Sequence, residues 1–143
     1  MERTVLERRT IHGVGLRGIG DGWVRGQVLK IDGAISFLGD VVPRTGILTF
    51  KGREYALKDR VLVFREGRGS TVGSYVIYNL KIEGQAPAAM VMIEADAIIT
   101  MGCIASGIPL VHRIDPGAFD ALEEGELVQV NSGRGLVEPL TAH

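Results

Sequence analysis

A chain of 143 residues, 45% of them hydrophobic, has the length of one domain and enough apolar side chains to bury a core. Its formal net charge of −1, with both signs spread along the sequence, argues against a basic surface for nucleic acid or membranes. The apolar runs are too short to span a bilayer, and the charged first ten residues do not resemble a signal peptide. The single cysteine, Cys103, is compatible with a reducing cytoplasm. We therefore expect one cytoplasmic domain, residues 1–143, that binds neither nucleic acid nor membranes.

The first stretch predicts a strand over Thr4–Ile11, followed by a literal G-x-G-x-x-G pattern over Gly13–Gly18. A dinucleotide-binding loop with this pattern has to open a helix. Here Ile-Gly-Asp-Gly follows at residues 19–22, which is typical of a turn. We interpret the pattern as a glycine-rich connection between strands.

Apolar and polar residues alternate over Trp23–Ile31, which predicts a strand, and Asp32-Gly33 is typical of the turn that would end it. A second apolar run, Ile47–Phe50, follows turns that contain Pro43 and Gly46.

Three polar residues, Ser36, Asp40 and Arg44, interrupt the apolar and turn-rich stretch before Ile47. They are candidate site residues, because loops carry function more often than cores do. Lys51–Arg60 is predicted to be a polar connection.

The central part predicts a strand, a helix and a second strand. Val61–Phe64 is short and β-branched enough for a buried strand, and Ala88–Ile93 is a second apolar run. Between them, Thr71–Glu83 can be helical, with Gly84 suited to the position after a helix. The residues Tyr75–Tyr78 favour a strand by propensity, but the flanking glycines and the second run favour a right-handed βαβ unit.

The glycine-rich turn Gly67–Ser70 lies where the predicted strand becomes the helix. Backbone N–H groups and the positive end of the helix dipole favour an anion there, and glycines let the backbone approach it closely. Ser70 adds a hydroxyl, and Arg68 adds a permanent cation with a planar set of donors. From spacing alone, Ser70 is either part of an anion site or a helix N-cap.

The last third predicts further helices and strands. The expected elements are a helix over Ala95–Ala105, a strand over Leu110–His112, a helix over Pro116–Leu122, and a hairpin of Leu127–Val130 and Leu136–Val137 around the turn Ser132–Gly135. The fold class is therefore α/β, or β/β/α, with a β-rich N-terminal half and a central βαβ unit. The histidines, His12, His112 and His143, are too scattered to predict a metal site, and Cys103 lies in an apolar run typical of a core.

Two motifs together resemble the small subunit of the aconitase X family, over about Gly13 to Val130. The first is Gly67–Ser74 (Gly-Arg-Gly-Ser-Thr-Val-Gly-Ser) followed by Ala86–Ala89 (Ala-Pro-Ala-Ala). The second combines Ile35–Gly39 with Pro43–Gly46, and the stretch Ile98–Val111 also fits. One position departs from the family pattern: Val42 stands where an aspartate is expected, although neighbouring Asp40 could substitute for it.

This resemblance implies a swivelling β/β/α domain like the mobile domain of aconitase. It implies a large-subunit partner with an iron–sulfur cluster, of the 4Fe-4S type, while this chain alone binds no cofactor. Chains of this length are similar to the archaeal small subunits of an isoprenoid-pathway enzyme that removes water from (R)-5-phosphomevalonate. Other family members dehydrate cis-3-hydroxyproline, which leaves that and other hydroxy acids as alternative substrates.

The resemblance also implies roles for individual residues. Ser70 is the expected catalytic base, while Arg68, Gly69, Thr71, Ser74 and Ser36 are expected to shape the turn or bind the substrate anion. A two-chain active site further implies an exposed apolar surface near Gly67–Ser70 for docking. The alternative from a different class is a non-catalytic module that binds phosphate or carboxylate, in which Ser70 is only an N-cap.

Overall fold

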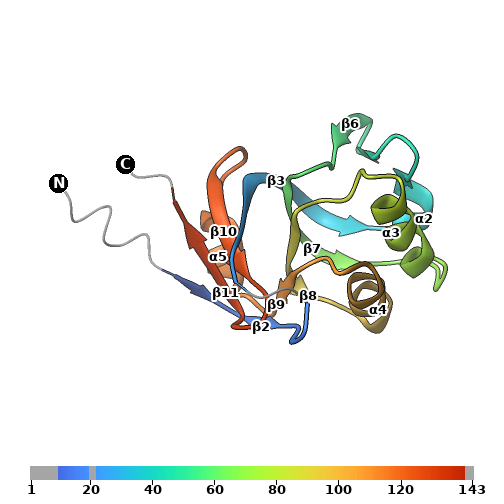
Figure 1. Ribbon diagram of the computed structural model, residues 1–143. Coiled ribbons are helices and arrows are strands. Elements are labelled where there is room, and N and C mark those ends of the chain that lie inside the picture. The colour runs from blue at the N-terminus through green and yellow to red at the C-terminus, as the bar shows by residue number, and fades with distance from the viewer. Residues whose placement is uncertain (1–9, 20–21, 141–143) are drawn as a thin grey trace.

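The computed structural model describes residues 10–19 and 22–140. Its strands are β1 (Ile11–His12), β2 (Val14–Gly15), β3 (Val24–Ile35), β4 (Val41–Val42), β5 (Ile47–Phe50), β6 (Arg53–Ala56), β7 (Val61–Gly67), β8 (Ala89–Glu94), β9 (Leu110–His112), β10 (Leu127–Asn131) and β11 (Leu136–Pro139). Its helices are α2 (Phe37–Asp40), α3 (Gly73–Ile82), α4 (Ala97–Ser106) and α5 (Pro116–Ala121). Figure 1 shows α2, α3 and α4 on one side of the molecule and α5 with β10 and β11 on the other.

A mixed eight-stranded sheet, in the order β1-β11-β10-β3-β7-β8-β9-β2, is accompanied by a three-stranded sheet, β4-β5-β6. The inner strands β3, β7, β8 and β9 are parallel, and the other pairings are antiparallel. This arrangement confirms the predicted α/β class with a β-rich N-terminal half and a central βαβ unit.

The two edges of the large sheet are connected by the glycine-rich segment near the N-terminal end of the described chain. β1 pairs with β11 at one edge and β2 pairs with β9 at the other, and only Gly13 separates them. A methyl group on Gly15 would stand 1.6 Å from the carbonyl oxygen of Ser132, so no larger residue fits there. The G-x-G-x-x-G pattern opens no helix, as expected, but it is more than a connection, because β2 lies inside it. Residues 4–9 of the predicted first strand lie outside the described residues, and its end is β1.

The parallel strands are buried on both faces, which explains their continuous apolar runs. Along β7, Leu62 and Phe64 join a core cluster with α3 and α4, while Val61 and Val63 join a second cluster with Phe119 of α5. The helix predicted at Thr71–Glu83 is present as α3, so tertiary packing overrides the strand propensity of Tyr75–Tyr78.

Two local predictions were wrong. Lys51–Arg60 is not only a connection, because it contains β6, which pairs with β5 although its side chains are largely exposed. Asp32-Gly33 does not end the preceding strand, because β3 continues to Ile35. The register with β7 shifts between Ile31 and Ala34, so Asp32 and Gly33 form a β-bulge.

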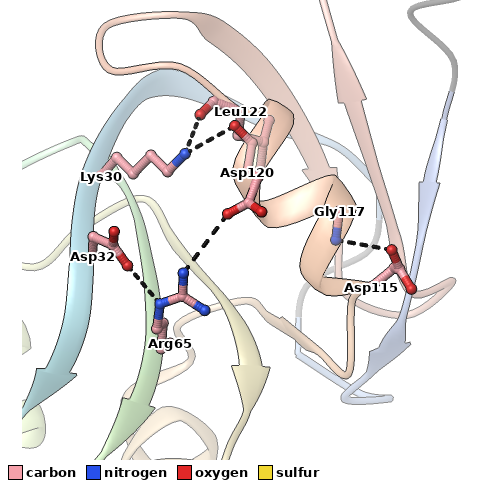
Figure 2. Close-up of polar contacts among 7 residues, drawn as sticks. All are labelled: Lys30, Asp32, Arg65, Asp115, Gly117, Asp120 and Leu122. Atoms are coloured by element: carbon pink, nitrogen blue, oxygen red, sulfur yellow. Dashed lines mark hydrogen bonds and ion pairs between the residues drawn. The ribbon is translucent and has the colours of Figure 1, made fainter.

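The bulge in β3 is held by an ion pair that Figure 2 shows. Arg65 of β7 donates to Asp32, lies near Asp120 of α5, and stacks 4.6 Å from the centre of the Phe119 ring. Lys30 donates to the carbonyl oxygens of Asp120 and Leu122 at the end of the same helix. The guanidinium of Arg65 holds the pKa of Asp32 below its ordinary value.

Candidate functional site

The predicted turn lies at the carboxyl end of β7, immediately before α3. The backbone N–H of Arg68 donates to the Ile35 carbonyl at 3.0 Å, which attaches the turn to the end of β3. Ser70 is not the N-cap of α3, because that position belongs to Val72, which makes no side-chain cap hydrogen bond. Instead, Ser70 Oγ accepts a hydrogen bond from the Val72 N–H at 3.1 Å. The N-cap position therefore falls at Val72, although the Ser70 hydroxyl still accepts from an N–H at the helix start, as a capping residue does.

The free donors lie before the helix rather than in its first turn. The N–H groups of Gly73, Ser74 and Tyr75 donate to the carbonyls of residues 70, 71 and 72. In the part of the chain that the structure describes, the N–H groups of residues 69–71 donate to no protein acceptor. Three consecutive unpaired N–H groups beside a hydroxyl can bind an anion.

Ser36 lies directly against this turn. It is the N-cap of α2, where its Oγ accepts from the Gly39 N–H at 3.4 Å. A methyl group on Gly69 would stand 2.6 Å from Ser36 Oγ, and Gly69 has a φ of +101°, which L side chains rarely adopt. The first part of the second motif and the glycine-rich turn thus form one site.

Asp40 connects the same two segments. Its Oδ2 accepts from the backbone N–H of Ser36 at 3.0 Å and lies 3.9 Å from Nη2 of Arg68. The Arg68 side chain is 62% exposed, whereas that of Asp40 is 22% exposed. Arg68 is therefore directed to Asp40, a contact that sequence reasoning missed. The sequence did contain a signal for the contact of Asp40 with Ser36, because the spacing between these residues is close to that of a capping box.

The other predicted turn residues are held within the turn itself. Ser74 Oγ donates to the Thr71 carbonyl at 3.2 Å, and the Thr71 side chain is exposed. Gly67, at the end of β7, packs against Ile99 of α4 so closely that a methyl group would stand 2.8 Å from its side chain. Of these residues, Thr71 is the most accessible to a ligand.

The second half of the second motif lies elsewhere. Gly46 packs against Gln85, beyond the C-terminal end of α3, so the loop 43–46 is at the opposite end of that helix from Ser70. Val42 is 55% exposed on β4 and pairs with Ile47. The Gly46 end of the loop that contains Arg44 therefore lies away from the turn, and no printed contact joins Val42 to Ser70.

No group of three or more His, Cys, Asp or Glu side chains suited to a metal ion occurs among residues 10–19 and 22–140. Cys103 is buried in the core beside Met90, and burial raises the pKa of its thiol to about 12. This thiol is a core side chain and is not set up as a ligand. In the same described ranges, no helix is long and apolar enough to cross a membrane.

Three exposed apolar side chains belong to the segments on either side of the turn. Leu38 of α2 is 50% exposed, Val72 is 44% exposed and Tyr75 of α3 is 69% exposed. Each belongs to a segment that borders Gly69 or Ser70. The candidate site at this turn therefore combines unpaired N–H groups with exposed apolar side chains in the neighbouring segments.

Comparison with known proteins identifies relatives over most of the chain. The family model described as the aconitase X swivel domain matches residues 14–139. A phosphomevalonate dehydratase small subunit of Methanococcoides burtonii is 45% identical over 125 residues, covering 85% of this chain and 91% of the relative. One from Pyrococcus abyssi is 43% identical over 127 residues, with coverage of 85% and 94%. In the crystal structure of Thermococcus kodakaraensis aconitase X, a chain with 39% identity superimposes with a TM-score of 0.84, covering 93% of this chain and 99% of that one.

Proposed function

Because this chain belongs to the aconitase X swivel-domain family, we propose that it is the small subunit of a two-chain hydro-lyase that dehydrates (R)-5-phosphomevalonate to trans-anhydromevalonate 5-phosphate. The choice of substrate is supported by the names of the relatives, which are phosphomevalonate dehydratase small subunits. The observation that carries the proposal is the meeting of Ser70, the unpaired N–H groups and Ser36 at one surface. The enzyme is a hydro-lyase subunit that is active only with the large subunit.

Dehydration beside a carboxylate breaks one C–H bond and one C–O bond. The base takes the α-proton, the C–H electron pair forms the double bond, and hydroxide leaves with the C–O pair. In this proposal Ser70 Oγ is the base. A serine hydroxyl accepts a proton well only as an alkoxide, and the Val72 N–H that donates to Oγ favours this charged form.

The anionic groups of the substrate need donors near Ser70. We assign this role to the N–H groups of Gly69, Ser70 and Thr71, to the guanidinium of Arg68 and to the hydroxyl of Ser36. Ser74 shapes the turn through its bond to the Thr71 carbonyl. A phosphorylated hydroxy acid matches this set, because every one of these groups can donate a hydrogen bond to an anion.

The iron–sulfur cluster, of the 4Fe-4S type, belongs to the proposed large subunit. Such a cluster is held by several thiolates, and the single buried Cys103 of this chain does not fit that requirement. When bound, the cluster supplies a Lewis acid for the departing hydroxyl group. We assign the complex to the cytoplasm, whose reducing conditions suit a chain with one free thiol.

The large subunit would dock beside the turn. Leu38, Val72 and Tyr75 provide exposed apolar area there, and a protein interface needs such a centre. Docking there would bring the cluster of the partner toward Ser70 and exclude water from the site.

The test is anaerobic co-expression with a candidate large subunit, followed by a dehydration assay on (R)-5-phosphomevalonate. We expect turnover only when both chains are present. A stable complex that dehydrates cis-3-hydroxyproline instead would retain the dehydratase class and change the substrate. If no complex forms with the large subunit encoded in the same genome, a non-catalytic anion-binding module replaces this proposal.

A further inference from the structure

We propose that Asp40 is a positioning residue that holds the guanidinium of Arg68 beside the Ser70 turn and fixes Ser36 at the same time. The catalytic relevance of this role rests on the proposed function, whereas the contacts of Asp40 are made within this chain alone. Asp40 Oδ2 accepts from the Ser36 N–H at 3.0 Å and lies 3.9 Å from Arg68 Nη2. One carboxylate oxygen thus serves both segments of the site.

The two segments follow the carboxyl ends of two adjacent parallel strands, β3 and β7. α2 follows β3 and the turn follows β7, and the Arg68 N–H, which donates to the Ile35 carbonyl, extends the backbone pairing of these strands into the turn. The β-bulge at residues 32–33 shifts the register so that Ile35 lies opposite Gly67. This register brings Ser36 to Gly69 and leaves Asp40, at the end of the short α2, within reach of Arg68.

Charge and exposure favour a positioning role over a cap alone. A cap needs only an oxygen acceptor for the Ser36 N–H, which an amide would also provide. The negative charge adds attraction for Arg68, whose side chain is otherwise 62% exposed and free to sample many rotamers. The contact of 3.9 Å is too long for a hydrogen bond, so Arg68 keeps its donors for a ligand while its position is restricted.

The variant that separates the two roles is Asp40→Asn, which keeps an acceptor and removes the charge. The matched control is Asp115→Asn, because Asp115 is also a carboxylate that accepts from a backbone N–H, at 2.9 Å from Gly117, but it belongs to α5 (Figure 2). Asp40→Ala removes both roles and measures the loss of the cap.

The first measurement is made on the full chain and needs no turnover. The side-chain Nε–H resonance of Arg68 is assigned by its loss in Arg68→Lys and then followed in each variant. We expect Asp40→Asn to shift this resonance and to speed its exchange with solvent, while the Ser36 N–H stays protected from exchange and the melting temperature stays near its wild-type value. Asp115→Asn should leave the Arg68 resonance unchanged. An Arg68 resonance that is the same in Asp40→Asn and in the wild type overturns the proposal.

The second measurement is a double-mutant cycle in the reconstituted two-chain enzyme. We expect Asp40→Asn to raise KM by about fivefold, the upper end for a part-exposed ion pair, with kcat changed less. In an Arg68→Gln background the same substitution should leave KM unchanged. Equal effects in both backgrounds overturn the proposal, because Asp40 would then act independently of Arg68. If the wild-type complex fails to dehydrate 5-phosphomevalonate, the proposed function fails, and the Arg68 resonance still decides the role of Asp40.

Discussion

The helices α3 and α4 follow adjacent parallel strands, yet their N-termini differ. α4 begins at a conventional cap, where the Asp96 side chain accepts from the Ile99 N–H at 2.9 Å. α3 begins at Gly73, its N-cap Val72 makes no side-chain hydrogen bond, and the N–H groups of residues 69–71 before it are unpaired within the described chain. The Asp96 cap satisfies one donor of α4, while the N–H groups of residues 96–98 also donate to no protein acceptor within the described ranges. The two starts differ in what lies beside the free donors: the hydroxyls of Ser70 and Ser36 before α3, and the carboxylate of Asp96 before α4.

The largest effect is expected from changing the backbone of the uncapped turn. Gly69→Ala combines a φ of +101° with a methyl group 2.6 Å from Ser36 Oγ, so the turn and Ser70 have to move. A displacement of about 1 Å at a reacting group costs on the order of 100-fold in rate. We expect a loss of that size in kcat of the two-chain enzyme.

The matched control is Gly22→Ala, since Gly22 has a φ of +104° and open space around the added methyl group. Backbone strain of about 1–3 kcal/mol should lower the unfolding free energy of both variants, while kcat should fall only in Gly69→Ala. Equal kcat values in the two variants would show that the close approach of Gly69 to Ser36 is not needed for catalysis.

At the capped start of α4, we expect substitution to lower stability and to leave kcat nearly unchanged. Asp96→Ala removes the acceptor for the Ile99 N–H and should cost about 1 kcal/mol of unfolding free energy, measured by chemical denaturation. Asp96→Asn, which keeps an acceptor, is the control and should cost less. A large fall in kcat in a folded Asp96→Ala variant would show that the start of α4 also takes part in catalysis.

The smallest effect concerns His112, at the end of β9 beside the start of α4. Burial of the ring lowers the pKa of His112 below its ordinary value of 6.5, although nearby Glu94 opposes the shift. The neutral Nδ1 accepts from the Ala95 N–H at 3.3 Å, and protonation removes this acceptor.

The unfolded chain therefore binds the His112 proton more readily than the folded chain. Stability from this group is fully present above pH 6.5 and decreases as the pH falls from there through the folded pKa. A melting-temperature series should show this decline in the wild type and a smaller one in His112→Gln. The same decline in both proteins would assign it to other groups.

Much of the fold follows from local signals in the sequence. The run Val61–Phe64 had to be a strand buried on both faces, and the glycine-rich turn after it identified the site. The strand β6 could not be predicted, because its exposed and polar residues form a strand only by pairing with β5. The continuation of β3 through Asp32-Gly33 also depends on distant residues, since Arg65 and the parallel neighbour β7 hold the bulge.

The sequence motifs nominated the candidate site residues, but they did not reveal how those residues contact one another. Ser70, Arg68 and Ser36 were found from motifs, but the ion pair of Arg68 with Asp40 depends on the register of β3 and β7. Likewise, the loop 43–46 belongs to the same motif as Ser36 in sequence, yet it packs beyond the far end of α3. Sequence proximity therefore overstated the extent of the site.

The central claim is that Ser70 is the base of a dehydration that requires both chains. The direct test compares kcat of Ser70→Ala and Ser74→Ala in the reconstituted enzyme, because Ser74 is a hydroxyl of the same turn that donates to the Thr71 carbonyl. We predict a loss of about 100-fold to 10,000-fold for Ser70→Ala, a much smaller loss for Ser74→Ala, and an intact complex in both. Wild-type turnover by an intact Ser70→Ala complex would contradict the account.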